Sequence, residues 1–428
     1  MQPSSPTESR RRYSSVLVVL LCLNFGVLFF DRNALNFLMP LVKPDLQLSN
    51  TEVGLLAAAF SLTWAIAGMA IGHVSDRSGR RKSLLLAATL VYALCSGLSG
   101  LVSSFVMLFC VRLLMGVAEG GILPISQALT VVEVSPQRRG LAMGFMQNFG
   151  SNLLGSTAAS LILVPFAAAY GWCSAFYLAA LPGVVCAALI AWLIREPVAS
   201  SPTEVRMHAS RATFMQVMQS RNIALCVLIS VVMVSHLVIC FAFLPLFLVQ
   251  RGFAGDTMAL LLGVLGVAAA FAGFIAPGLS DRVGRKPIMV LLPLLGIVLP
   301  LSALFFNGSV WLLGLLFFIG WTVIGTFPLF MATIPSETVD TRLLATTLGL
   351  IMGMGEGVGG VISPTLAGYA ADRFGLVAPL WIMCVLPLLA SALALGLRET
   401  APHKLAATPT RINHAVNTTL PVKGERHA

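Results

Sequence analysis

The sequence predicts an all-α membrane protein with twelve transmembrane helices in two pseudo-symmetric six-helix bundles and both termini in the cytoplasm. Three observations support this fold class. First, 57% of the 428 residues are hydrophobic and 10% are charged, whereas soluble domains carry about 25% charged residues. Second, twelve apolar segments approach the length of roughly 20 residues that crosses a bilayer. Third, motifs in the first half of the chain recur in the second half.

The twelve apolar segments are long enough to cross the membrane one after another. In chain order, the predicted spans cover residues 15–41, 52–75, 83–101, 104–132, 141–168, 174–194, 222–249, 257–279, 287–306, 310–333, 343–370 and 375–397. The first is too long for the apolar part of a cleaved signal peptide, so we expect it to stay in the membrane. The eight cysteines show no paired spacing, so we expect neither a disulfide framework nor a metal site.

The basic residues indicate which loops face the cytoplasm. If the N-terminus lies in the cytoplasm, 22 of the 27 Lys and Arg residues fall in cytoplasmic segments. Lys43, Arg251 and Arg373 are expected outside, and Arg32 and Arg112 lie within spans. This distribution follows the positive-inside rule. The net charge of +10 therefore reflects topology and gives no support to nucleic acid binding.

The chain divides into two halves of similar design. We expect a cytoplasmic tail, a six-helix bundle, a polar cytoplasmic linker, a second six-helix bundle and a disordered cytoplasmic tail at residues 1–14, 15–194, 195–221, 222–397 and 398–428. "SDRSGRRK" from Ser75 recurs 205 positions later as "SDRVGRKP" from Ser280. Parallel six-span halves with a substrate site between them are a transporter architecture.

The repeated loop identifies a family resemblance. "GHVSDRSGRRK", from Gly72 to Lys82, resembles the signature loop of the major facilitator superfamily, and its second copy strengthens the match. The resemblance implies that this loop latches the two halves together in one conformation. The implied latch residues are Gly72, Asp76, Arg77, Gly79 and Arg80, with Asp281, Arg282 and Arg285 in the second copy. The alternative is that the basic residues only anchor the topology.

Several ionisable residues lie deep in predicted spans, where charge is costly and usually functional. At about 1.5 Å of rise per residue, Asp31, Arg112 and Glu119 occupy similar depths. Arg112 and Glu119 are seven residues apart and share one helix face. Asp31 and its neighbour Arg32 cannot face each other, so each needs a partner from another helix. The fourth span offers one charge of each sign.

The Asp-Arg pair and "RLLMGVAEGGILP", from Arg112 to Pro124, narrow the resemblance. Together they resemble the anion:cation symporters, which carry sugar acids and other organic anions with protons. The resemblance implies substrate binding by Arg32 and Arg112 and proton coupling by Asp31 and Glu119. Burial disfavours the charged form of a carboxylate and a nearby arginine favours it, so protonation could free an arginine for the anion. The alternative is a static salt-bridge network.

Four polar residues outside that pattern are further candidates. Glu356 could be a second proton site, a specificity residue or a structural partner of a basic group. His236 is central in its span, and we predict substrate contact, although a lone histidine is often a satisfied core residue. Asn148 and Asn152 share a face and could hydrogen-bond substrate or bond across helices.

These features predict a transporter and no enzyme. The chain shows no phosphate-binding loop and no nucleophile–base constellation, so we expect no cofactor and a proton gradient as the energy source. We expect proton-coupled uptake of an organic carboxylate (sugar acid, dicarboxylate or aromatic acid) by a monomer in a bacterial inner membrane. Its partners are the anion, protons and lipid.

Two other functions stay open at this point. One is an exporter of drugs, metabolites or lysolipids, as in the Spinster type. The absence of a Gly-Pro pair in the fifth span, which proton-driven drug exporters of the superfamily carry, favours uptake. The other is a non-transporting sensor built on the same fold.

Overall fold

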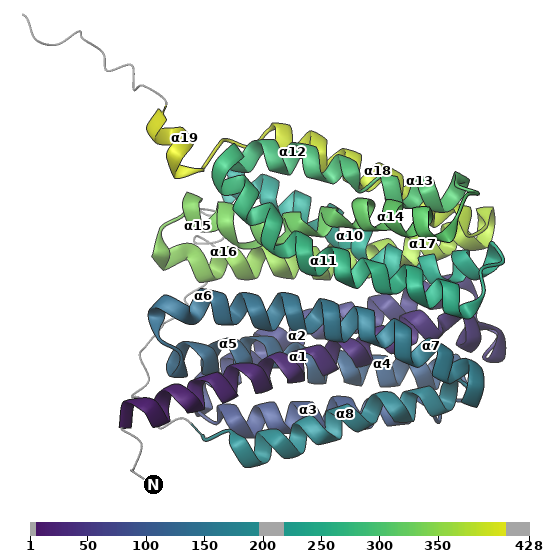
Figure 1. Ribbon diagram of the computed structural model, residues 1–428, viewed down its shortest axis with the longest axis horizontal. Helices are drawn as coiled ribbons and strands as arrows, with labels where there is room; N and C mark the ends of the chain where they lie inside the picture. The colour runs from purple at the N-terminus through teal and green to yellow at the C-terminus, as the bar shows by residue number, and fades with distance from the viewer. Residues whose placement is uncertain (1–5, 197–217, 408–428) are drawn as a thin grey trace, which may run out of the picture.

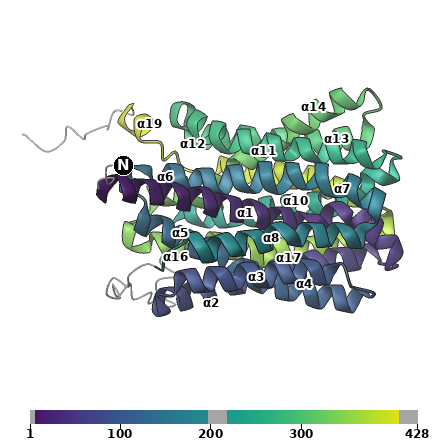
Figure 2. The same cartoon turned by 60° about the horizontal axis from the view of Figure 1, so that its bottom comes forward.

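The computed structural model describes residues 6–196 and 218–407. Most of the predicted linker and C-terminal tail, with residues 1–5, lies outside the described residues. Twelve of the described helices are long and apolar enough to cross a membrane, in agreement with the twelve predicted spans. They run along one common direction, and the start of α1 and the C-terminal helix α19 lie at the same end of the molecule (Figures 1 and 2).

The first half consists of six spans, two of which are interrupted. Its elements are α1 Pro6–Asp45, α2 Asn50–Ser78, α3 Arg81–Ser99, α4 Phe105–Gly120, α5 Ile122–Glu133, α6 Pro136–Gly144, η1 Phe145–Thr157, α7 Ala158–Tyr170 and α8 Trp172–Leu193. α4 and α5 form one span that breaks at Gly121, and α6, η1 and α7 form the next.

The second half repeats this plan with more interruptions. Its elements are α10 Arg221–Gln250, α11 Gly255–Val283, α12 Arg285–Leu295, α13 Val298–Phe305, α14 Val310–Trp321, η2 Thr322–Thr326, η3 Leu329–Thr333, α15 Ile334–Thr338, α16 Thr341–Met354, η4 Gly355–Gly359, α17 Gly360–Phe374, α18 Val377–Leu395 and α19 Pro402–Ala407. Figure 1 shows the first half below and the second half above.

The two halves share a core at one end and have separate cores at the other. We call the end with the turns at Gly79 and Gly284 the loop end, and the end with Asn50 and Asp372 the far end. One apolar cluster at the far end contains residues of both halves, such as Phe37 and Phe243. At the loop end, each half buries its own cluster. The halves are therefore joined at the far end.

Hydrogen bonds at the far end tie the halves together through the start of α2. The Asp372 carboxylate accepts the backbone N–H groups of Asn50 and Thr51, both at 2.8 Å, and the Thr51 hydroxyl at 2.5 Å. Within α2, Ser49 and Glu52 form a capping box. A second-half residue thus completes the N-terminal cap of a first-half helix.

Wide helical turns occur at the repeated glycines. The π-helical segments η1 and η4 overlap at the 205-residue offset, since Gly150, inside η1, corresponds to Gly355, the first residue of η4. A side chain at Gly150 would lie 2.7 Å from the Cys22 carbonyl oxygen of α1, and one at Gly355 would meet the Ser230 hydroxyl of α10. Such π-helical turns often mark functional sites, and these two segments border the space between the halves.

Candidate functional site

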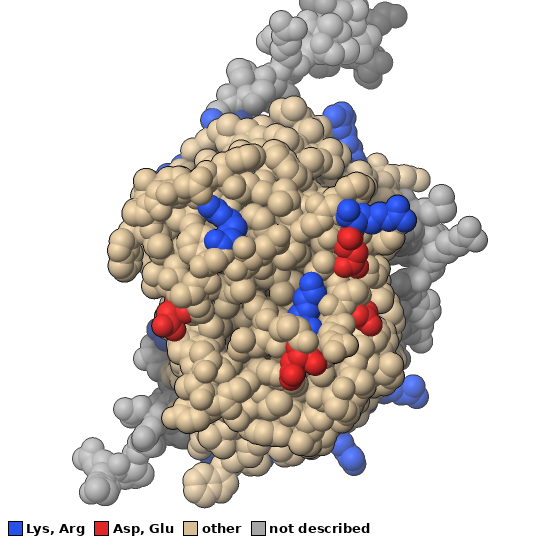
Figure 3. Space-filling view, turned by 90° about the vertical axis from the view of Figure 1, so that its right-hand side faces the viewer, with Lys and Arg blue, Asp and Glu red and all other residues tan. Residues whose placement is uncertain are grey.

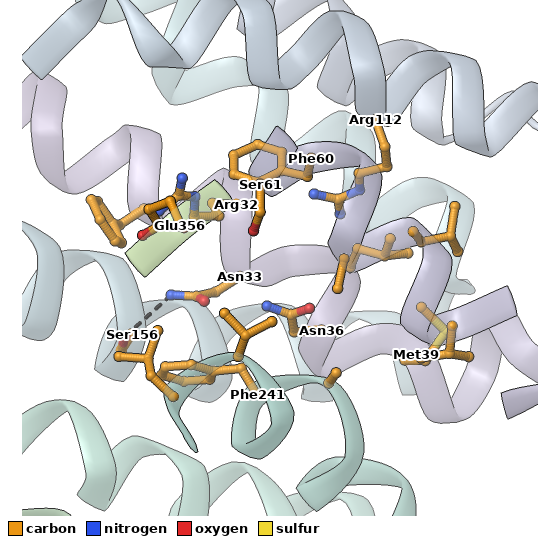
Figure 4. Close-up of a pocket in the computed structure, with 18 of the residues that line it drawn as sticks. Arg32, Asn33, Asn36, Met39, Phe60, Ser61, Arg112, Ser156, Phe241 and Glu356 are labelled. Carbon is orange, nitrogen blue, oxygen red and sulfur yellow. Dashed lines mark hydrogen bonds between the residues drawn. The ribbon is translucent and has the colours of Figure 1, made fainter. Parts of the chain in front are cut away.

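A cavity lies between the two halves, bordered by elements of both (Figure 4). Its volume is about 970 Å³ when the open mouth is counted. The lining includes the predicted residues Arg32, Arg112, Asn152 and Glu356. Four candidates that are scattered over more than three hundred positions of the sequence therefore meet at one site.

Three residues on one side of α1 form the polar centre of the cavity. Arg32, Asn33 and Asn36 all line it, because positions spaced by three or four residues share one side of a helix. The Asn33 side chain donates to the Ser156 hydroxyl at 3.1 Å and to the Gly155 carbonyl at 3.4 Å (Figure 4). These bonds fix α1 against η1.

Arg32 is held by a carboxylate and by aromatic rings. Its Nε lies 3.4 Å from Glu119, which agrees with the prediction that a span 1 charge pairs with span 4. Its guanidinium lies over Phe29, Phe60 and Trp64, with centroid distances of 5.0, 4.3 and 5.2 Å, a favourable cation–π arrangement. Figure 4 also shows Arg32 next to Glu356 of the second half.

Arg112 has far fewer partners than Arg32. Its residue is 4% exposed, and its only hydrogen bond to a described residue goes from Nη1 to the Met115 sulfur at 3.5 Å. Nε and Nη2 have no hydrogen-bond partner among the described residues. Figure 4 places it on the Asn36 side of the cavity, away from Glu356. A buried guanidinium with unused donors in a cavity wall is suited to bind a carboxylate.

The two first-half carboxylates lie behind the arginines. Asp31 and Glu119 are fully buried, and neither is part of the cavity lining. The oxygens of both make no hydrogen bond to a described residue, although Asp31 lies close to Ser96 and within electrostatic reach of Arg112 and Glu119. Four charges of balanced sign thus share one buried network, and only the positive members face the cavity.

Two predicted binding residues lie away from the cavity lining. His236 is fully buried and places Nδ1 3.2 Å from the Met383 carbonyl oxygen, with its ring 5.9 Å from that of Trp321. Asn148 lies against Gly273 of α11, where it packs between the halves. The cavity therefore brings together Arg32, Arg112, Asn152 and Glu356, and it leaves these two side chains outside.

Some of the residues that line the cavity were not predicted from the sequence. Asn33, Asn36, Ser61 and Phe60 belong to this group. Asn33 and Asn36 follow the Asp-Arg pair at helical spacing, so placing that pair on a helix wheel would have suggested them. Ser61 and Phe60 are ordinary residues of an apolar span, and only the folded structure shows that they face the cavity.

The predicted latch residues lie at the loop end. Arg285 bonds Asp281 at 2.5 Å and Glu337 at 2.8 Å, and so ties the second-half loop to α15. Arg77, Arg80 and Arg282 are exposed. Gly79 ends α2 in a left-handed conformation, with φ of 66°, while Gly72 lies against Pro124. The side chain of Asp76 lies outside what the structure describes.

An equivalent glutamate caps the helix after each loop. Glu196 accepts the backbone N–H groups of Lys82 and Ser83 at 2.9 and 3.2 Å, and Glu399 accepts those of Arg285 and Lys286 at 2.8 and 3.2 Å. Burial alone would raise the pKa of Glu399, but four backbone hydrogen bonds outweigh it and hold the pKa below its ordinary value of 4.5. The two loops are therefore built alike.

The fold and the paired loops agree with a family model. The model described as "Major Facilitator Superfamily" matches residues 21–355. The chain belongs to this superfamily. It is a multi-pass membrane transporter rather than an enzyme.

Known proteins similar to this transporter include carriers of organic anions. It is 29% identical to a probable 4-methylmuconolactone transporter of Cupriavidus pinatubonensis, over 83% of each chain. It is 25% identical to the sialic acid transporter NanX of Escherichia coli, over 83% of this chain and 87% of the relative. A solved bacterial homologue of Spinster, inward-facing and unoccupied, superposes with a TM-score of 0.72 at 19% identity, over 92% of this chain and 95% of the other.

Proposed function

We propose that this transporter takes up an organic carboxylate together with protons, across the inner membrane of a bacterium. The observation that carries the proposal is the buried charge network. Arg112 offers unused donors to the cavity, while Arg32 is paired with Glu119 behind the cavity wall. An organic anion and a proton can therefore act on the same set of charges.

The relatives support the anionic substrate class. The two relatives described above are named as transporters of 4-methylmuconolactone and sialic acid. A third, 26% identical over 84% of this chain and 88% of its own length, is a hexuronate transporter of Bacillus subtilis.

The arrangement of the halves supports alternating access. The excess of basic residues at the loop end supports a cytoplasmic position for that end by the positive-inside rule, and charged side chains are few on the far end (Figure 3). The shared core and the Asp372 bonds then close the outer side. In this state the cavity serves the cytoplasm, and the loops around Asp76 and Asp281 would latch the opposite state.

Coupling follows from competition for the arginines. When Glu119 is ionised, it holds Arg32. When Glu119 takes up a proton, that pair weakens and the positive charge on the cavity side is less compensated. Substrate binding then becomes more favourable, and proton release to the cytoplasm restores the pair and favours substrate release. Asp31, which lies beside the same network, would act as a second proton carrier, and Glu356 in the cavity wall as a third.

Replacing Glu119 by Gln tests this coupling in proteoliposomes. The neutral amide mimics the protonated acid, so we expect proton-driven uptake to fall by at least about a hundredfold, the low end for loss of a proton-transfer group. Substrate counterflow, which needs no net proton movement, should largely survive. Glu52→Gln is a matched control, because a capping box accepts Gln in place of Glu.

Three outcomes would contradict the proposal. Equal loss of uptake and counterflow in Glu119→Gln would assign Glu119 a structural role. Expulsion of an amphipathic substrate under an inward proton gradient, without carboxylate accumulation, would favour an exporter. Ligand binding without flux would favour a sensor.

A further inference from the structure

The two walls of the cavity differ in chemistry. The first-half wall contributes seven polar side chains, namely Arg32, Asn33, Asn36, Ser61, Arg112, Asn152 and Ser156. The second-half wall contributes Leu237, Val238, Phe241 and Ala242 from α10, Ala269 from α11, and Trp321 and Ile324. Apart from Glu356, which lies near Arg32, its only side-chain hydrogen-bonding group is the indole N–H of Trp321. The first-half wall also contributes seven apolar side chains. The polar side chains of the cavity are therefore concentrated on the first-half wall, whereas the second-half wall is almost wholly apolar.

The internal repeat shows that this asymmetry sits at equivalent positions. At the 205-residue offset, the polar residues of α1 that line the cavity correspond to apolar residues of α10 that line it from the other side. The pairs are Arg32 with Leu237, Asn33 with Val238 and Asn36 with Phe241. Glu119 likewise corresponds to Ile324. The same backbone positions thus carry polar side chains in one half and apolar side chains in the other.

From this asymmetry we infer that the substrate is a compact monocarboxylate with an apolar ring body. The inference rests on the proposed function and specifies its substrate. The carboxylate binds Arg112, whose Nε and Nη2 are unused, on the Asn36 side of the cavity (Figure 4). The ring lies against Val238, Phe241 and Trp321, where aromatic and aliphatic surfaces favour an apolar body. Polar substituents, where present, face α1 and η1.

Two other acid classes fit this cavity poorly. A sugar acid carries hydroxyl groups on both faces of its ring, and those that face the second-half wall would lose hydrogen bonds to water without replacement. A dicarboxylate would place its second charge either on the apolar wall or near Glu356, whose charge would repel it. Arg32 offers the second charge little, because three aromatic rings lie around its guanidinium.

Ligand-induced thermal stabilisation of the purified full-length transporter tests the inference directly. The probes are benzoate and cyclohexanecarboxylate, with glucuronate and succinate as the other acid classes and benzamide as the uncharged analogue. We expect the two ring monocarboxylates to raise the unfolding temperature and to bind at least about tenfold more tightly than glucuronate or succinate, because unmatched polar groups reduce affinity strongly. Benzamide should have no effect.

The outcomes separate this inference from the proposed function. Stabilisation by glucuronate or succinate but not by the ring acids would overturn the inference and leave organic-anion transport standing. No response to any carboxylate would overturn both. Equal stabilisation by benzamide would overturn the carboxylate anchor.

Exchanging a wall residue for its repeat partner provides a second test. Val238→Asn places an asparagine in the second-half wall, as at the equivalent position 33 of the first half. We expect the preference in binding for benzoate over glucuronate to fall by about tenfold. Val238→Thr adds a hydroxyl while keeping the side-chain shape, so it tests the same idea with less risk to folding. Val249→Asn, at the exposed end of α10, is the matched control. An unchanged preference in folded Val238 variants would overturn the inference.

Discussion

At the scale of single residues, two arginines of the same cavity have different surroundings. Arg32 lies between a carboxylate and three aromatic rings. Arg112 keeps two nitrogens without a partner among the described residues. A guanidinium that is already neutralised gains little from a second anion, whereas one with unused donors gains a charge-assisted pair. This difference supports the proposal that Arg32 takes part in coupling and that Arg112 anchors the substrate.

Arg112→Lys tests the anchoring role. The substitution keeps the positive charge and removes the planar fork that binds a carboxylate with two donors. We expect KM for uptake to rise by about 10- to 100-fold, since a hydrogen bond to a charged group contributes about 1.5–3 kcal/mol. Arg373→Lys, which changes an arginine stacked on Tyr369, is the control. A fall in kcat with unchanged KM would contradict the assignment.

The sequence predicted the charges of the site better than its shape. Helical depth and the seven-residue spacing were enough to bring Arg32 to span 4, and the structure pairs it with Glu119. The exclusion of His236 could not be foreseen, because its orientation depends on the Met383 carbonyl, 147 positions away. Asp31 was expected to pair with span 4, and it lies within electrostatic reach of Arg112, although its oxygens make no hydrogen bond to a described residue.

At the scale of elements, a carboxylate positions each loop-end helix. Glu399 accepts N–H groups from the first turn of α12, where a helix leaves its backbone donors unpaired. It also accepts those of Thr400 and Ala401 at 3.0 and 2.9 Å. Glu196 does the same for α3. The repeat therefore extends to the caps that hold the signature loops in place.

Glu399→Gln tests the cap through the pH dependence of stability. Because the pKa of Glu399 in the folded protein lies below its ordinary value of 4.5, its contribution to stability is complete above that value. It is lost as pH falls through the lower, folded pKa. We expect the variant to lose about 1 kcal/mol of stability at neutral pH, and to converge with the parent in acid.

Thermal unfolding of both proteins over a pH series measures this difference. Asp340→Asn is a suitable control, because Asp340 stands at the N-cap of α16 without a side-chain cap bond. A constant difference between parent and variant at all pH values would contradict the ionic role of Glu399.

The elements themselves were predictable to differing degrees. Hydropathy placed all twelve spans, because each needs about 20 apolar residues. The repeated glycines were visible in the sequence, but the π-helical turns η1 and η4 were not. Their width depends on how closely α1 and α10 approach, as at Gly150 and Gly355, and no local pattern encodes that approach.

At the scale of the whole molecule, the far end joins the two halves, together with the packing of α11 against η1. Gly54 of α2 lies directly against the backbone of Pro364 in α17, with no room for a side chain. A side chain at Gly54 would therefore push α2 and α17 apart. The sequence repeat predicted two halves, but it could not show which ends touch, because that depends on the conformation adopted.

Gly54→Ala therefore should favour opening of the far end. We expect faster labelling of Asn36→Cys from outside by a membrane-impermeant thiol reagent, in a variant whose native cysteines, such as the exposed Cys110, are replaced. Gly278→Ala is the matched control, because a methyl group there meets nothing within 4 Å. Equal labelling in both variants would show that this packing does not govern the opening.

In the proposed transport cycle, the bond between Asp372 and α2 completes the cap of that helix only while the far end is closed. With the far end closed, Ser49 caps the Glu52 amide and Asp372 caps those of Asn50 and Thr51. When the halves part, water can replace Asp372, so no polar group is left buried without a partner. In this proposed cycle, each turnover would uncap and recap the Asn50 and Thr51 amides while the Glu52 amide stays bonded to Ser49. The backbone amides of Asn50 and Thr51 are therefore natural reporters of the transport cycle. The Glu52 amide, one residue away, is the internal reference.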